Sequence, residues 1–214
     1  QEYWRDQRRP ASQSKEVIMS VEYHFIEQGT DEWLKKREGM YTGSNAYKLL
    51  GNLGVADYAK AVSSEFRGNF WTKRGHLLED DSLELYETIT GETILRSEAG
   101  IKVGYITNTK YPNCLYSPDA ITAALLECKS FDTKQHLELI RGEIPLKIMA
   151  QIQYGLTISE LPGAKLIPYN PSFAKKIIKD KTTGQMVENK LYNPELAFKI
   201  IDIPPNRAAI ANFD

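Results

Sequence analysis

The chain has 214 residues, of which 42% are hydrophobic and 26% are charged, and it contains two cysteines. This length and composition supply the core of one domain, and they exclude a disulfide-rich scaffold or a zinc site built from a CxxC pair. The formal net charge of −1 neither favours nor excludes nucleic acid as a partner.

Membrane association is not expected, because no apolar stretch approaches the roughly 20 residues needed to cross a bilayer. Cys114 and Cys128 are too few for a disulfide framework, so we expect free thiols in a reducing, intracellular compartment. Residues 1–20 are polar and lack a hydrophobic period, which indicates an N-terminal arm or leader. Residues 21–214 are expected to form a single domain.

Capping signals and apolar periodicity predict five helices. In TDEWLKKREG, Thr30 precedes two acids and Gly39 follows the last turn, while Ser44 is the expected cap of GSNAYKLLG. The helices are expected over residues 30–39, 44–51, 55–66, 70–90 and 145–158. The apolar face of the longest is formed by Leu78, Leu85, Tyr86 and Ile89.

Strands are predicted between the fourth and fifth helices and once more after the fifth. Short runs rich in β-branched and aromatic residues are separated there by Gly, Asn and Thr, which favour turns. The expected strands are ETILRSE (92–98), IKVGYITN (101–108), CLYSPDAI (114–121), ALLECKSF (124–131) and AKLIPYN (164–170). This order predicts an α/β fold with a central mixed β-sheet flanked by helices.

Three charged residues interrupt the two central strands. Because side chains alternate along a strand, Glu127 and Lys129 share one face, and Cys128 lies on the other. A hairpin that turns at residues 122–123 would place Asp119 opposite Glu127. Two carboxylates within reach of one cation favour Mg²⁺ or Mn²⁺, and a neighbouring ammonium can align a water and offset charge at a phosphate.

The D-x7-E-x-K spacing also arises by chance, and these acids would then be solvated positions at a sheet edge. The apolar neighbours of Glu127 favour a buried strand instead, where an unpaired carboxylate costs several kcal/mol. Pro118 favours a bend just before Asp119, since proline is poorly tolerated in a central strand. The flanking residues therefore favour a built site.

Five segments in order resemble one family: EQGTDEWLKKREGMYTGSNA, RGHLLEDDSLELYETITG, YSPDA, LECKS and MAQIQYGL. They are similar to the lambda-exonuclease or YqaJ-type viral recombinase branch of the PD-(D/E)xK nucleases. The resemblance covers residues 26–171. It implies a restriction-endonuclease-like core and a Mg²⁺-dependent deoxyribonuclease, with Mn²⁺ as a substitute, that degrades one strand of linear double-stranded DNA from its 5′ end.

By the same resemblance, Asp119 and Glu127 are metal ligands, the backbone carbonyl of Cys128 is a further ligand, and Lys129 is the catalytic lysine. Glu79 matches the family's helix-borne acid near the metal, as an outer group or on a second ion. Without the resemblance, Glu79 would be interpreted as part of a solvated acidic helix face.

The remaining matched residues concern the substrate. Gln151 matches the glutamine that positions the nucleophile and the phosphate. Arg37 and Ser44, assisted by Ser117, match residues that bind a 5′-phosphate. Without the resemblance, Gln151 would be interpreted as a polar helix position, Arg37 as a surface cation and Ser44 as a helix cap.

The resemblance further implies phage-type recombination or repair, in the cytoplasm of a bacterium or a virus-infected host cell. Implied partners are double-stranded DNA ends, a single-strand annealing recombinase and further copies of the chain in a ring. Ala120, Ser130 and Phe131 depart from the family's usual Gly and Cys-Pro, without removing a ligand.

Two alternatives stay open at this point. The same core could act as a structure- or site-specific DNA endonuclease, or it could be a catalytically silent DNA-binding module. The filled ligand positions disfavour the silent module. An iron–sulfur nuclease of this superfamily is excluded, because its cluster needs four cysteines and the chain has two.

Overall fold

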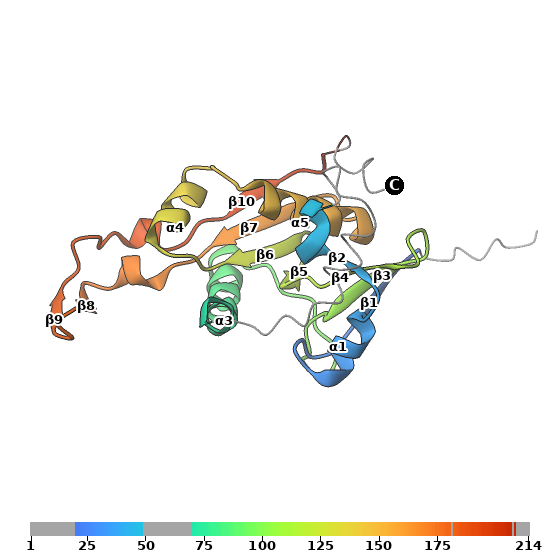
Figure 1. The fold of residues 1–214 in the computed structure, drawn as a ribbon, viewed down its shortest axis with the longest axis horizontal. Coiled ribbons are helices and arrows are strands. Elements are labelled where there is room, and N and C mark those ends of the chain that lie inside the picture. The colour runs from blue at the N-terminus through green and yellow to red at the C-terminus, as the bar shows by residue number, and fades with distance from the viewer. Residues whose placement is uncertain (1–19, 49–69, 181, 207, 209–214) are drawn as a thin grey trace, which may run out of the picture.

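The computed structural model describes residues 20–48, 70–180, 182–206 and 208. The expected helix over 55–66 lies outside this part of the chain, as does the expected N-terminal arm apart from Ser20. The described residues form an α/β fold with mixed sheets, as the sequence predicted (Figure 1). Within them, no helix combines the length and the apolar character needed to cross a membrane.

Two four-stranded mixed sheets make up the centre. The first has the order β1 (Val21–His24), β3 (Tyr105–Asn108), β4 (Cys114–Tyr116), β2 (Tyr41–Thr42), and its β2–β4 pair is parallel. The second has the order β10 (Ile201–Ile203), β7 (Ala164–Pro168), β6 (Leu125–Lys129), β5 (Ala120–Ile121), and its β6–β7 pair is parallel. The chain passes from the first sheet to the second through residues 117–119.

The helices lie around these sheets, and an outlying hairpin extends away from them (Figure 1). The α-helices are α1 (Asp31–Arg37), α3 (Phe70–Thr90), α4 (Thr133–Ile140) and α5 (Leu146–Ser159). The 3-10 helices are η1 (Gly43–Lys48), η2 (Pro171–Ala174) and η3 (Pro194–Leu196). The hairpin consists of β8 (Ile177–Lys179) and β9 (Met186–Glu188).

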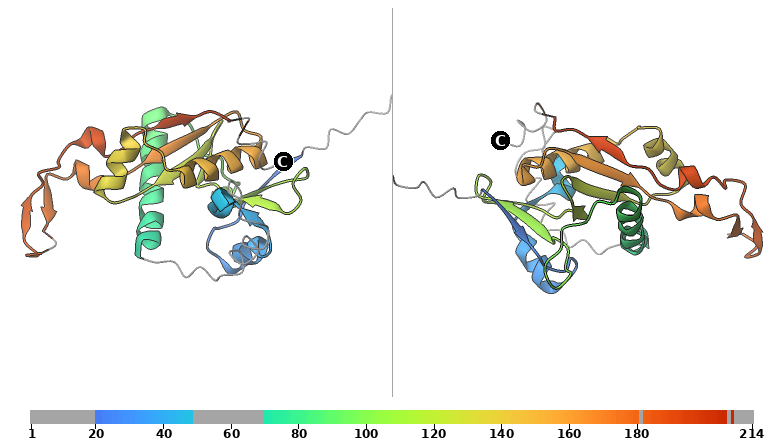
Figure 2. Two further views of the ribbon diagram at one scale, coloured as in Figure 1. Left: turned by 45° about the horizontal axis from the view of Figure 1, so that its top comes forward. Right: turned by 180° about the vertical axis from the view of Figure 1, so that it is seen from behind.

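Strand β6 is covered on both faces. Leu125 packs in the cluster that contains the buried residues of α5, whereas Leu126 packs with Leu83 and Tyr86 of α3. Successive side chains of a strand point to opposite faces, so α5 and α3 lie on opposite sides of the second sheet, as Figure 2 shows. The face of β6 that carries Glu127 and Lys129 is therefore covered by α5.

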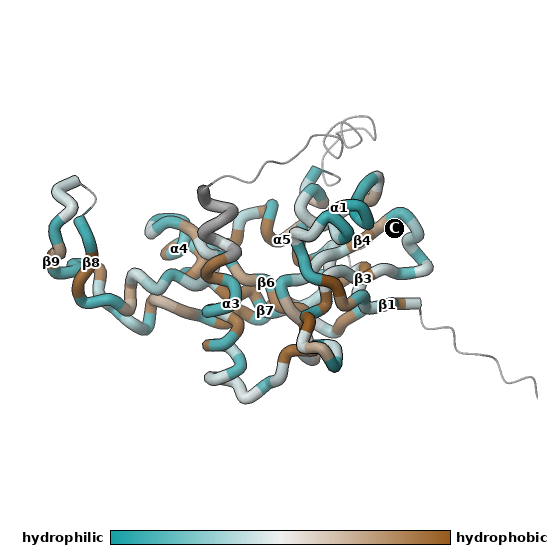
Figure 3. The backbone as a smooth tube through the Cα atoms, turned by 90° about the horizontal axis from the view of Figure 1, so that it is seen from below, coloured by the Kyte–Doolittle hydropathy of each residue, from teal (hydrophilic) through white to brown (hydrophobic). Residues whose placement is uncertain are grey.

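The hydropathy of the chain follows this burial. None of the residues of α1 is buried, and Figure 3 shows hydrophilic positions along it. Ten of the residues of α5 are buried, which agrees with a helix packed into the core. On α3 the predicted face is partly wrong: Tyr86 is buried, together with Leu83, but Ile89 is 58% exposed.

The predicted helix ends are confirmed in α1 and α5. The start predicted at Ser44 is wrong, and the end predicted for that segment at residue 51 lies outside the described residues. The side chain of Thr30 caps α1 and accepts a hydrogen bond from the backbone N–H of Trp33 at 3.3 Å. The next segment forms the 3-10 helix η1, in which Ser44 is the second residue rather than the cap. Strand β2 leads directly into η1, so no extended cap residue separates the two elements.

All five predicted strands are shorter than expected, and three of them differ most. Residues 92–98 make only the Arg96–Lys102 bridge, and 101–108 form a strand only from Tyr105. The run 114–121 is split into β4 and β5, which pair in different sheets, because the chain bends at Pro118 between them. Helix α4 was not predicted, although Asp132 caps it by accepting a hydrogen bond from the N–H of Gln135 at 3.0 Å.

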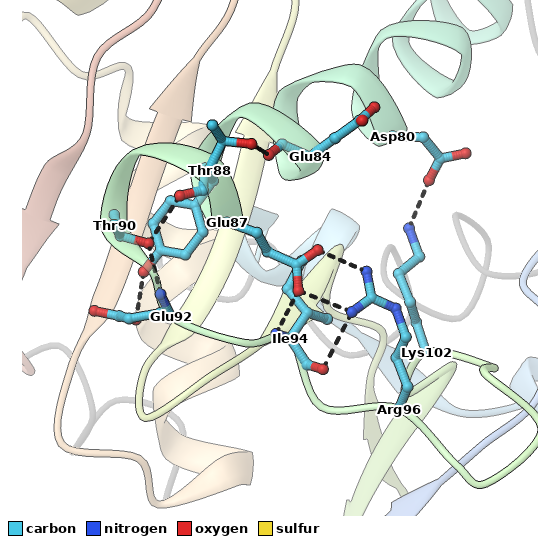
Figure 4. A network of polar contacts seen from close by, with 10 residues as sticks. Asp80, Glu84, Glu87, Thr88, Thr90, Glu92, Ile94, Arg96 and Lys102 are labelled. Atoms are coloured by element: carbon cyan, nitrogen blue, oxygen red, sulfur yellow. Dashed lines mark hydrogen bonds and ion pairs between the residues drawn. The ribbon is translucent and has the colours of Figure 1, made fainter.

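Side chains of α3 fix the segment that follows the helix (Figure 4). Arg96 donates to both carboxylate oxygens of Glu87, at 2.9 and 3.0 Å, and the N–H of Ile94 donates to Glu87 at 2.8 Å. The hydrogen bonds from Arg96 lower the pKa of Glu87 despite its partial burial. These contacts hold the following segment against α3 without regular strand pairing.

Replacement of Glu87 by glutamine is expected to lower the free energy of unfolding at pH 7 by about 1 kcal/mol, because both partners are partly exposed and solvent screens the ion pair. A lowered folded-state pKa contributes stability above the unfolded-state pKa, and this stability is lost as the pH falls through the folded value. Urea unfolding should therefore separate the variant from the natural chain at pH 7 and not at about pH 3. Glu84→Gln, on an exposed position of the same helix, is the control.

Candidate active site

The hairpin of β5 and β6 brings the first two predicted acids together. Ala120 pairs with Leu126, and the same antiparallel register continued by one residue sets Asp119 opposite Glu127. The backbone N–H of Cys128 donates to Oδ2 of Asp119 at 2.6 Å. The bend between β4 and β5 therefore directs Asp119 at the strand that carries the other site residues. Cys114 and Cys128 are free thiols, as expected.

Glu127 is fully buried, at 0% exposure, and both of its carboxylate oxygens accept hydrogen bonds. The hydroxyl of Tyr116 donates to Oε2 at 2.6 Å. The ammonium of Lys129 and the side-chain amide of Gln151 both donate to Oε1. Because side chains alternate along a strand, Lys129 lies on the same face of β6 as Glu127. Helix α5 covers this face and contributes Gln151. These donors make the burial of a charged carboxylate tolerable.

Electrostatics in this cluster are dominated by negative charge. Burial raises the pKa of Asp119 well above its usual range, and the charges of Glu127 and Glu79 raise it further, against the opposing effect of Lys129. Burial acts to lower the pKa of Lys129, but Glu127 and Asp119 outweigh it, so the pKa lies above its ordinary value and the amine stays charged. The positive charge of Lys129 therefore does not fully compensate the carboxyl groups that lie near it.

The donor set fits a hard divalent cation. Asp119 and Glu127 provide carboxylate oxygens, which Mg²⁺ and Mn²⁺ prefer, and a divalent charge would offset the excess negative charge of the cluster. Among the residues that the structure describes, however, no three His, Cys, Asp or Glu side chains converge as metal ligands. Two carboxylates are therefore in place, and the third expected acid stands apart from them.

That third acid, Glu79 on α3, forms an ion pair. Lys102 donates to Oε1 of Glu79 and to Asp80, each at 3.0 Å, and the side chain of Glu79 is 20% exposed. Glu79 still acts on Asp119, because its charge raises the pKa of that acid. Glu79 and Lys102 line a cavity of about 440 Å³ together with Gln28, whose amide donates to the carbonyl of Pro118 at 2.7 Å.

The residues expected to bind a 5′-phosphate come from three parts of the chain: α1, η1 and the segment that follows β4. Arg37 at the end of α1 donates to the hydroxyl of Ser117 at 2.8 Å, and its guanidinium stacks on Trp33 at 4.2 Å. Ser44 is exposed on η1, and its hydroxyl lies 3.3 Å from that of Thr42. Arg37 and Ser117 are therefore in direct contact, while Ser44 lies on η1, which packs on α5.

Comparison with known protein families identifies the family of this chain. Residues 32–162, more than half of the chain, match the family described as the YqaJ-like viral recombinase domain. The chain belongs to this family. No curated protein matches the chain significantly.

Solved structures share the fold of this YqaJ-like chain. The alkaline exonuclease LHK-Exo from Laribacter hongkongensis is similar at 20% identity with a TM-score of 0.64, over 85% of this chain and 86% of that chain, and it has also been solved in complex with dAMP. A phage-related exonuclease from Haemophilus somnus 129PT is similar at 13% identity with a TM-score of 0.56, over 84% of this chain and 90% of that chain. The predicted family and fold class are thereby confirmed.

One residue of the YqaJ-like site was missed by the sequence analysis. Tyr116 was quoted within YSPDA and given no role, yet its hydroxyl binds Glu127 and its ring is 1% exposed. The ring is enclosed by two glycines: a Cβ on Gly43 or on Gly155 would lie 2.6 Å from it. A glycine in the middle of α5 is unfavourable for a helix, and this was the available signal of a close contact.

Proposed function

We propose that this YqaJ-like chain is a Mg²⁺-dependent deoxyribonuclease that degrades one strand of linear double-stranded DNA from its 5′ end. The observation that carries the proposal is the pairing of Asp119 with Glu127 across the hairpin, beside the charged amine of Lys129. Family membership and the fold shared with the two solved exonucleases support the same conclusion.

Each residue of the cluster has a role that follows from its chemistry. Asp119 and Glu127 hold the divalent ion, with the backbone carbonyl of Cys128 as a further oxygen ligand. When bound, the ion supplies charge neutralisation at the phosphodiester and a water of lowered pKa. Lys129 keeps its proton and offsets the charge that develops on the scissile phosphate, and Gln151 orients the attacking water with its amide. Glu79, on α3, adds a negative charge near Asp119 and raises its pKa.

The 5′ direction of degradation follows from the residues expected to bind a 5′-phosphate. Arg37 presents a planar guanidinium, which matches phosphate oxygens, and Ser117 is bonded to it. With Ser44 they form the receptor for a terminal 5′-phosphate. Ser117 is two residues from Asp119, so a phosphate bound here would fix the register of the DNA end relative to the metal ligands.

Digestion of end-labelled DNA tests the proposal. With Mg²⁺, a 5′-phosphorylated linear duplex should lose one strand from the 5′ end, and EDTA should stop the reaction. A duplex with 5′-hydroxyl ends should be degraded more slowly, and a closed circle should stay intact. Cutting of the circle at a comparable rate would replace the exonuclease by an endonuclease on the same core, and absence of cleavage with both Mg²⁺ and Mn²⁺ would contradict nuclease activity.

A further inference from the structure

Tyr116 holds Glu127 in a way that the other donors to this carboxylate do not. Its ring is wedged between Gly43 of η1 and Gly155 of α5, each so close that an added Cβ would overlap the ring. The hydroxyl can therefore reach Oε2 from one direction only. Lys129 and Gln151, which donate to Oε1, have long side chains with several rotatable bonds.

The two carboxylate oxygens of Glu127 therefore differ in how firmly their hydrogen-bond donors are held. Oε2 is bound to a donor that packing holds in place, at 2.6 Å. Oε1 is bound to donors that can turn away toward a substrate. A metal ion that approaches Glu127 can thus replace the donors at Oε1, because it brings a positive charge of its own, whereas at Oε2 it must displace a buried ring.

We propose that Tyr116 is a positioning residue that restricts Glu127 to a single metal-binding oxygen and so favours Mg²⁺ over Ca²⁺. Mg²⁺ binds one oxygen from each carboxylate in compact octahedral geometry, whereas Ca²⁺ takes more ligands and accepts a carboxylate through both oxygens. The inference rests on the proposed function, because it assumes that Glu127 is a ligand of the catalytic ion.

Removal of the hydroxyl alone tests this role. In Tyr116→Phe the ring still fills the space between the two glycines, so the fold should be retained, and Oε2 of Glu127 becomes available. Calorimetric titration of the metal-free protein, without DNA, should show Mg²⁺ affinity reduced about tenfold, as is usual when a group that orients a metal ligand is lost. Ca²⁺ affinity should stay the same or rise.

A matched control is Tyr154→Phe. Tyr154 is equally buried, its ring lies 6.4 Å from that of Tyr116, and its hydroxyl donates to the backbone carbonyl of Tyr41 at 2.9 Å. This variant loses a buried hydroxyl that does not touch Glu127, so it should leave the affinities for both ions within about twofold of the natural protein while its thermal stability falls.

Gly155→Ala tests the enclosure of the ring, because the added methyl group must displace Tyr116 or the helix. It should weaken Mg²⁺ binding in the natural background and have no further effect on it in Tyr116→Phe, since the two changes then act through one hydroxyl. The proposal is wrong if Tyr116→Phe binds Mg²⁺ as before, or if the affinities for both ions fall equally. A natural protein that bound neither ion would contradict the proposed metal site itself, which is a separate failure.

Discussion

Substitution of Glu127 by glutamine is expected to lower the rate of duplex digestion by roughly 10³-fold or more, because the charge contributed by a metal ligand is worth several kcal/mol in the transition state. Glutamine keeps the shape of the side chain in its fully buried position, and it can still accept hydrogen bonds from Tyr116 or Lys129. The loss should therefore reflect chemistry rather than misfolding. Digestion of an end-labelled linear duplex in Mg²⁺ measures it.

Binding of DNA in EDTA should be nearly unchanged in Glu127→Gln, since the substitution removes a negative charge and no phosphate contact. Fluorescence anisotropy with a labelled duplex provides this measurement. Asp202→Asn is the matched control, because Asp202 lies in the same sheet on β10, its side chain is 81% exposed, and it pairs only with Lys165 among the contacts described. Equal digestion rates for Glu127→Gln and Asp202→Asn would remove Glu127 from the site.

The hairpin was predictable from the sequence because its determinants are local. Pro118 marks the bend, residues 122–123 mark the turn, and the alternation along 125–129 fixes which side chains share a face. The burial of Glu127 also followed from its apolar neighbours. A register set by the turn then determines that Asp119 faces Glu127, and no long-range information is needed for this step.

Other parts of the site depend on contacts between distant residues. The enclosure of Tyr116 joins residues 43, 116 and 155, and a single sequence contains no signal that pairs them. The same holds for Lys102, which lies in a segment predicted as strand and in fact pairs with Glu79 on α3. The sequence placed Glu79 near the metal, as an outer group or on a second ion, and it contained no signal of the lysine that pairs with this acid.

Lys129→Met is the second substitution for which we expect a large effect, and it should act on both catalysis and folding. Loss of the amine should slow digestion by roughly 10²- to 10⁴-fold, the range for a group that assists proton transfer or charge development. It also leaves Glu127 buried without its cation, which should lower the free energy of unfolding in EDTA by about 3 kcal/mol. Tyr116 and Gln151 still donate to the carboxylate, so the protein should remain folded. Digestion rates and urea unfolding measure the two effects.

The double variant Glu127→Gln with Lys129→Met separates the two roles of the pair. Neutral side chains then occupy both positions, so most of the stability lost in Lys129→Met should return, while digestion should stay at least as slow as in either single variant. Added Mg²⁺ should raise the midpoint of thermal unfolding of Lys129→Met, since a cation bound by Asp119 and Glu127 replaces the missing charge, and it should not raise that of the double variant. A double variant as unstable as Lys129→Met would show that the lysine supports the fold by packing its alkyl chain, and not by compensating the charge of Glu127.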